Sequence, residues 1–186
     1  MDNIKNIKRI ESYSLSDKDI RKVFKPNRIN IVEYQNLNNY DHIDDLFKNS
    51  DYTFCVMFFP ENEQKSYGHW TCILKHENGK YEYFDSYANY KPDSERKWLT
   101  DQLIKNLHEE NPLLTEFFLR SSILKIIINP YPLQSTRNGV NDCGDHVCCR
   151  LLHRDMNLNQ YWEMIKQSRM NPDKYVSLFI YKILGK

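Results

Sequence analysis

A cysteine stands at the predicted start of a helix in the C-terminal third of the sequence. The turn-rich segment 138–142 leads directly into Cys143, and a helical pattern of apolar residues follows. Unpaired N–H groups at a helix N-terminus and the helix dipole stabilise a thiolate, which is the nucleophilic form of cysteine. Gly144 would leave room for a substrate backbone beside the sulfur. The pattern predicts Cys143 as a nucleophile; the alternative is a small buried apolar residue.

Upstream residues supply the other groups that nucleophilic catalysis needs. His69 begins one predicted strand and Asp85 ends the next, so a base and an acid precede Cys143 in the chain. A nucleophile, a base and a group that orients the base together make a catalytic triad. The two strands flank Asn78-Gly79, which is a strong hairpin signal.

The hairpin can adopt two registers, and only one of them pairs the histidine with the aspartate. An ideal two-residue turn would place Cys72 opposite Asp85, with His69 on the other face. If Gly79 instead forms a one-residue bulge in the left-handed conformation, Thr71 lies opposite Asp85, and His69 is diagonal to Asp85 on the same face. A catalytic pair therefore requires the bulged turn.

These motifs together resemble the Ulp/adenain-like cysteine proteases of clan CE. The shared features are His-Trp at a strand start, an aspartate sixteen residues later, a glutamine in a loop, and Asp-Cys-Gly opening a helix. That family includes SUMO-specific proteases and the maturation proteases of adenoviruses, large DNA viruses and virophages. The resemblance spans residues 69–149 and is greatest to the viral and virophage members.

The resemblance implies a role for each motif residue. His69 would be the general base, Asp85 the carboxylate that orients it, and Cys143 the nucleophile. The side-chain amide of Gln134 and the backbone N–H of Cys143 would form the oxyanion hole. Gln134 lies nine residues before Cys143, a longer interval than the family pattern has, so two loop asparagines stay open as alternative donors. These are Asn138 and Asn141.

The resemblance also implies substrate-binding roles for Trp70 and Gly144. An indole at Trp70 would cover the imidazole and limit its contact with water; an ordinary core tryptophan is the alternative. A narrow cleft between Trp70 and the cysteine loop would require small residues, glycine above all, just before the scissile bond. Asp142 is expected to cap the helix or to hold the loop.

A metal site is the main chemical rival to this interpretation. His146, Cys149 and His153 have i, i+3, i+7 spacing on one predicted helix, and Cys143 lies one turn away. The closely spaced ligand pairs of a structural zinc site are absent. A solvated stripe of His146, Arg150 and His153 is favoured, and neither a metal nor a cofactor is expected.

Charge and composition limit the other rivals. Lys and Arg number 26 against 25 Asp and Glu, so the chain lacks the cationic field of a dedicated nucleic-acid binder. Residues 1–28 carry eight basic and four acidic residues, which leaves open an accessory nucleic acid, as it does an activating peptide. A non-catalytic binding module of the same fold is a third rival, but it would need a broken triad.

The elements that must position these residues indicate an α+β fold. The 186 residues are too few for two ordinary domains, so a single domain over 1–186 is expected, and the resemblance implies that it is a cysteine protease domain. The resemblance implies a central, mostly antiparallel sheet flanked by helices, in the papain-like fold with reversed chain order. Predicted strands cover 52–59, 69–75, 81–85 and 123–128. Predicted helices cover 17–25, 40–48, 94–108, 143–153, 160–166 and 173–184.

The sequence also suggests a compartment and a substrate class. It has no secretory signal or membrane-spanning run, and its odd set of five cysteines indicates free thiols. A monomer in the host cytoplasm or virus factory, and packaged in the virion, is expected, without membrane partners. The preferred substrate is a capsid or core precursor cut during virion maturation. The alternative is a ubiquitin-like or SUMO-like protein, cut by isopeptidase activity.

Overall fold

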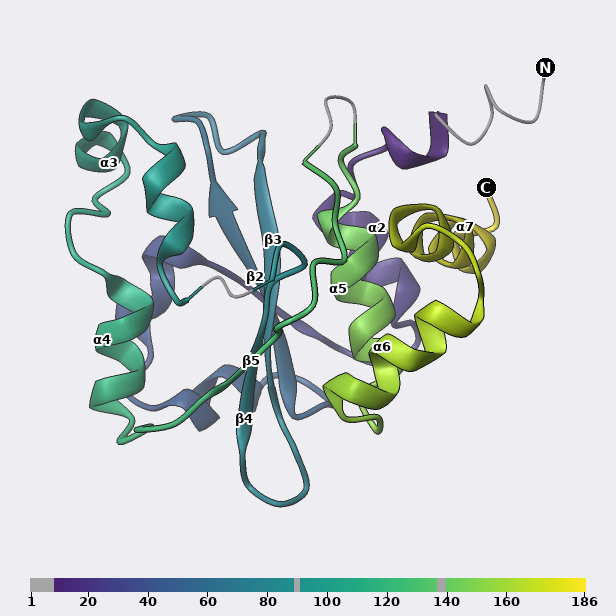
Figure 1. Ribbon diagram of the computed structural model, residues 1–186. Helices are drawn as coiled ribbons and strands as arrows, with labels where there is room; N and C mark the ends of the chain where they lie inside the picture. The colour runs from purple at the N-terminus through teal and green to yellow at the C-terminus, as the bar shows by residue number, and fades with distance from the viewer. Residues whose placement is uncertain (1–8, 89–90, 137–139) are drawn as a thin grey trace.

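The computed structural model describes residues 9–88, 91–136 and 140–186, and its centre is a five-stranded mixed sheet with helices on both faces (Figure 1). The strands lie in the order β1-β2-β3-β4-β5. The three inner strands are antiparallel, whereas both edge strands pair in parallel with their neighbours. Their bounds are Asn30–Glu33, Phe54–Pro60, Gly68–Lys75, Tyr81–Phe84 and Ile127–Ile128. This mixed sheet confirms the α+β class.

Each face of the sheet carries its own apolar cluster. Successive side chains of a strand point to opposite faces, so Val56 and Phe54 join one cluster while Cys55 and Met57 join the other. The first face is covered by α2 (Asp17–Val23), α5 (Cys143–Leu152), α6 (Leu158–Gln167) and α7 (Pro172–Leu184). The second is covered by η1 (Tyr34–Asn39), η2 (Ile43–Phe47) and α4 (Leu113–Arg120). Burial on both faces explains the continuous apolar run of β2.

Local capping signals set the ends of two helices as the sequence predicts. Ser16 and Asp19 form a reciprocal capping box at the start of α2. Asn171 caps α7, and Pro172 occupies its first turn, where a missing N–H costs nothing.

The hairpin between β3 and β4 adopts the bulged register. Gly79 has a φ of 76°, and the His76 N–H donates to the Lys80 carbonyl at 2.8 Å. Cys72 pairs with Phe84, which sets Thr71 opposite Asp85. Of the two registers that the sequence left open, this is the one that a His69–Asp85 pair requires.

Other elements differ from the predictions. The single helix predicted over 94–108 is wrong, because the chain forms η3 (Ser94–Trp98) and then α3 (Asp101–Asn106). Thr100 is extended between them, and its side chain accepts a hydrogen bond from the Leu103 N–H, so it begins a new helix. The strand predicted over 123–128 shortens to β5. The helix predicted over 40–48 shortens to η2. Neither β1 nor α4 was predicted.

Within the described ranges, no helix is both long enough and apolar enough to cross a membrane.

Candidate active site

His69 and Asp85 form a buried pair at one end of the hairpin. His69 follows the first residue of β3, and Asp85 directly follows β4. The His69 Nε2 atom lies 3.2 Å from Asp85 Oδ2, and the side chains are 3% and 1% exposed. The Tyr87 N–H donates to the other Asp85 oxygen at 2.8 Å. Burial alone would raise the pKa of Asp85, but His69 outweighs it and lowers that pKa.

Cys143 adds a thiol to this buried pair from a different part of the chain. It is the first residue of α5, and it lines the same cleft as His69, whose pKa it helps to raise. Burial disfavours the charged imidazole, but Asp85 and then Cys143 outweigh burial and hold the pKa of His69 well above its ordinary value. The ring therefore favours its protonated form, with a carboxylate on one side and the sulfur on the other.

Gln134 lines a small cleft together with His69 and Cys143, and the volume of this cleft is about 150 Å³. Its Oε1 accepts a 2.5 Å hydrogen bond from Ser86 Oγ, and its backbone N–H donates to the Ser86 carbonyl at 3.0 Å. Because the amide oxygen is held by Ser86, the Nε2 group is the end of the side chain left for a ligand. The structure therefore brings together His69, Asp85, Gln134 and Cys143.

The two asparagines left open as alternative oxyanion donors are Asn141 and Asn138. Asn141 also lines the cleft, but its Nδ2 donates to the Ser12 carbonyl at 3.3 Å, and its backbone N–H donates to the Glu11 carbonyl at 2.9 Å. Asn141 thus fastens the cysteine loop to the N-terminal segment. Asn138 lies outside the described residues.

The prediction that Trp70 covers the imidazole is wrong. Trp70 packs on Phe58 with ring centroids 4.5 Å apart, and its Nε1 donates to the Leu15 carbonyl at 3.0 Å. Two other rings pack on His69: Tyr87 is stacked at 5.2 Å and Trp98 is edge-on at 5.3 Å. The physical reason is strand alternation, which turns Trp70 toward the cluster beneath α5.

The prediction that Gly144 leaves space for a substrate is also wrong. A Cβ atom there would lie 2.9 Å from Leu15 Cβ and 3.2 Å from Trp70 Cδ1. The lack of a side chain at Gly144 lets α5 approach those two residues, so protein atoms fill the space.

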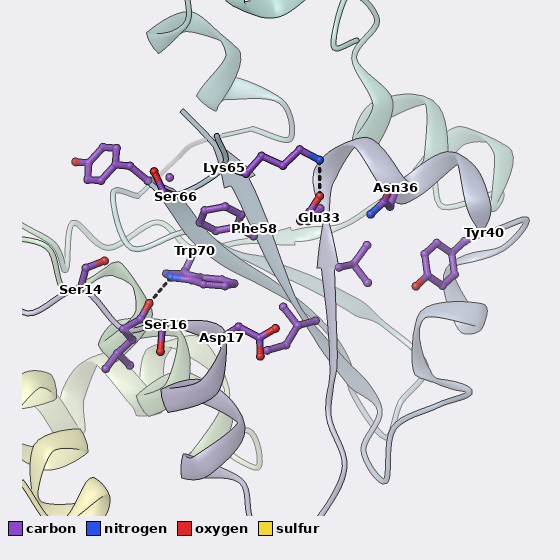
Figure 2. A pocket seen from close by; sticks show the side chains of 15 residues that line it. Ser14, Ser16, Asp17, Glu33, Asn36, Tyr40, Phe58, Lys65, Ser66 and Trp70 are labelled. Atoms are coloured by element: carbon purple, nitrogen blue, oxygen red, sulfur yellow. Dashed lines mark hydrogen bonds and ion pairs between the residues drawn. The ribbon is translucent and has the colours of Figure 1, made fainter. Parts of the chain in front are cut away.

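A larger groove of about 390 Å³ adjoins the cleft (Figure 2). Phe58 and Trp70 lie between segment 14–17 on one side and residues from β1 and η1, including Glu33, on the other. Lys65 closes part of the opening through a 2.7 Å ion pair with Glu33. The residues common to the groove and the cleft are Ser14, Tyr67 and Gly68.

Glu95 is a site residue that the sequence did not reveal. It is buried in η3, and one of its carboxylate oxygens lies within 4.8 Å of ligand atoms of His69 and Asp85. The Tyr83 hydroxyl donates to Glu95 Oε1 at 2.6 Å. Burial, and then the charge of Asp85, raise the pKa of Glu95 to about 8. An acid within a predicted amphipathic helix gives no signal for such a position.

The solvated stripe predicted on α5 is wrong as well. His146 and Arg150 are fully buried, and Arg150 makes two hydrogen bonds to Glu82 at 2.8 and 2.9 Å. Cys149 Sγ lies 3.8 Å from His153 Nδ1. In the part of the chain that the structure describes, His146 does not join those two residues in a metal-ligand cluster. Nothing therefore supports the zinc set considered from the sequence.

His146 instead faces two carboxylates. Its Nε2 atom lies 3.1 Å from Asp173 Oδ1, at the start of α7, and 4.0 Å from Asp142 Oδ2. Asp142 occupies the capping position of α5, yet its side chain makes no capping hydrogen bond. The predicted capping role is therefore wrong.

The fold and the cleft define an α+β protein in which a buried histidine–aspartate pair faces a cysteine at a helix start. The chain belongs to the family of protein V9 of Sputnik virophage, an uncharacterized protein. The two are 30% identical over 179 residues, which cover 94% of this chain and 98% of V9. No known family profile matches the chain.

Two solved structures show a weaker likeness. The central domain of the uncharacterized Lpg1148 protein from Legionella pneumophila has a TM-score of 0.40 and 13% identity, over 92% of this chain and 96% of that one. A de-sumoylating protease has a TM-score of 0.36 and 15% identity, over 97% of this chain and 78% of that one. Both scores lie below the level at which a shared fold is assigned.

Proposed function

We propose that this chain is a cysteine peptidase that uses Cys143 as its nucleophile. The observation that carries the proposal is the position of the His69 imidazole, which lies 3.2 Å from the Asp85 carboxylate and lines the same cleft as the Cys143 thiol. A thiol, a base and an orienting carboxylate are the parts that nucleophilic catalysis requires. The proposal includes the reversed-order papain-like fold, in which the histidine precedes the cysteine in the chain.

The reaction follows from these contacts. The Cys143 sulfur attacks the carbonyl carbon of the scissile peptide bond, after His69 has taken the thiol proton. His69 gives this proton to the leaving nitrogen as the C–N bond breaks, which leaves a thioester on Cys143. Water then attacks the thioester and gives a proton to His69, and the returning sulfur accepts that proton. The carboxylic acid product is released.

Negative charge develops on the carbonyl oxygen in both tetrahedral intermediates. The Cys143 N–H and the Nε2 group of Gln134 are the donors assigned to this oxygen. Ser86 holds the other end of the Gln134 amide, so this donor is positioned before the substrate arrives. Preorganised donors of this kind stabilise a transition state more than a ground state.

The substrate proposed is a viral capsid or core precursor with glycine at the cleavage site. The cleft of about 150 Å³ favours small residues beside the sulfur, and the virophage relative supports a viral context. The adjoining groove between Trp70 and segment 14–17 would hold the more distant substrate residues.

The experiment compares the purified protein with two variants on candidate substrates. Virophage capsid and core proteins and ubiquitin-like precursors are incubated with wild type, Cys143→Ala and the matched control Cys55→Ala, and new N-termini are identified by mass spectrometry. Wild type and Cys55→Ala should cut the viral proteins after small residues. Cleavage by Cys143→Ala would overturn the proposal. Cleavage of the ubiquitin-like precursors alone would replace the maturation role with isopeptidase activity.

A further inference from the structure

A second cluster of ionisable groups lies behind the nucleophile. Asp142 directly precedes α5, His146 lies in the first turn of α5, and Asp173 lies in the first turn of α7. Their ligand atoms all lie within 4.8 Å of one another. All three side chains have an exposed fraction of 1% or less. None of the three lines the cleft that His69 and Cys143 share, so the cluster is separate from that cleft.

The Asp142 carboxylate makes no hydrogen bond among the described residues; its contact with another residue of the cluster is the 4.0 Å ion pair with His146. Both of its oxygens are buried without a hydrogen bond among the described residues, and so is the Nδ1 atom of His146. Burial of an unpaired carboxylate is strongly unfavourable, and buried polar atoms in native proteins are almost always hydrogen-bonded. Asp142 also forgoes the capping bond that its position offers and turns toward His146. The orphaned oxygens point to a missing positive ligand.

We propose that Asp142, His146 and Asp173 bind one divalent transition-metal ion, with Zn²⁺ as the best fit. One imidazole nitrogen and two carboxylate oxygens are ordinary zinc ligands, whereas Mg²⁺ and Ca²⁺ prefer oxygen ligands alone. A tetrahedral ion with ligands at about 2.0–2.1 Å holds its donor atoms roughly 3.4 Å apart. The two measured separations, 3.1 and 4.0 Å, bracket that value. The second oxygen of Asp142 is available for a further bond.

Charge supports the same assignment. The buried carboxylate of Asp142 has no hydrogen-bonded partner among the described residues, and a bound cation would neutralise its negative charge. The ion would also connect two parts of the proposed catalytic site. Asp142 directly precedes Cys143. Asp173 accepts hydrogen bonds at 3.1 and 3.2 Å from the backbone N–H of Ser135, the residue that follows Gln134. Metal binding itself does not depend on the proposed peptidase activity.

The test uses the full chain with the Cys143→Ala substitution, so that zinc cannot bind the cleft thiol. The protein is stripped with a chelator and titrated with Zn²⁺ against a competing chromophoric chelator, and the bound metal is measured by mass spectrometry. About one equivalent of zinc should bind, and it should raise Tm by roughly 5 °C. Asp142→Asn and Asp173→Asn in the same background should lose both effects. Asp145→Asn is the matched control, because Asp145 is a buried acid of α5 that faces Ser177 instead.

Co²⁺ substitution of the Cys143→Ala parent tests the ligand set without further variants. Tetrahedral nitrogen and oxygen ligation should give visible d–d bands without a thiolate-to-cobalt charge-transfer band. Any one of three outcomes would overturn the proposal. The first is the absence of stoichiometric zinc, which would mean that the cluster holds a proton instead. The others are equal zinc binding by Asp142→Asn and a thiolate-to-cobalt charge-transfer band.

Discussion

The Tyr83 hydroxyl donates a 2.6 Å hydrogen bond to Glu95, and both side chains are buried beside the carboxylate of Asp85. Two adjacent buried carboxylates cannot both ionise at low cost. Asp85 is the one that His69 keeps charged, so Glu95 holds the proton. The carboxylate proposed to orient His69 therefore lies next to a neutral acid that can donate a hydrogen bond to it.

Glu95→Gln should make the protein relatively more stable as the pH rises. The carboxyl of Glu95 ionises at an ordinary pKa of 4.5 when the chain is unfolded, but at about 8 in the folded protein. Its contribution to stability is thus complete below the lower value and is lost as the pH approaches the higher one. The Tm of Glu95→Gln minus that of wild type should grow between pH 5 and pH 8. Glu116→Gln, at an exposed acid, should give no such trend, and a difference independent of pH for Glu95→Gln would contradict the assignment.

His69→Ala and Asp85→Asn should differ in severity. In the proposed mechanism His69 transfers the proton, so its loss should lower kcat/KM almost as far as loss of the Cys143 thiol. An asparagine at position 85 can still orient the ring, so Asp85→Asn should retain roughly 10–100 times more activity than His69→Ala. Steady-state kinetics on one peptide substrate measure both variants. Normal kinetics for Asp85→Asn would leave this aspartate with a structural role in the hairpin.

Gln134→Ala should lower kcat by about 10²–10³-fold with little change in KM, because the lost donor acts mainly on the developing oxyanion. Ser86→Ala should show a smaller loss in the same parameter, since it frees the amide that Ser86 holds. Asn141→Ala is the control, because its side chain is already bonded to Ser12. An unaffected Gln134→Ala enzyme would move the oxyanion role to a loop asparagine.

A peptide panel tests the size of the cleft. Replacing glycine just before the scissile bond by alanine, valine or leucine should reduce kcat/KM progressively, because the space beside Cys143 is only about 150 Å³. Equal cleavage of the bulky peptides would show that the narrow cleft does not select the substrate.

Glu82→Gln should destabilise the fold without any catalytic involvement. The Glu82 carboxylate takes two hydrogen bonds from the buried Arg150 guanidinium and lies 2.9 Å from His76 Nε2. Removing one partner of a buried pair leaves an uncompensated charge, which typically costs about 3–5 kcal/mol. The exposed Arg21–Asp17 pair is the control, and its loss should cost about 0.3–0.5 kcal/mol. Urea denaturation measures both, and equal effects would contradict this reasoning.

Local signals predicted the parts of the site that depend on short stretches of chain. The Asn78-Gly79 turn indicated a hairpin and permitted the bulged register that a His69–Asp85 pair requires, and the turn before Cys143 indicated a helix start; the structure has both the bulged hairpin and the helix start. Contacts between distant segments were not predictable. Leu15 reaches Trp70 and the surface of α5, which fills the space expected at Gly144.

The buried charges show the same limit. Charged and polar residues on a helix usually indicate its solvent face, so Arg150 and His146 were placed there. Their partners, Glu82 and Asp173, lie on other elements, and no period within α5 reveals them. The position of Glu95 in the site was not predicted for the same reason, because Tyr83 and Asp85 lie outside its own helix.

The bonds from Asn141 to Glu11 and Ser12 have a consequence for the order of folding. They close a loop of about 130 residues, whose entropy must be lost before its contacts can stabilise anything. The β3–β4 hairpin closes over a few residues, so we expect it to form first. An early intermediate would then hold the histidine and aspartate in register while the thiol is still remote. Under the proposed mechanism, a partly folded molecule of this kind has no base beside its thiol and would not cleave the chains around it.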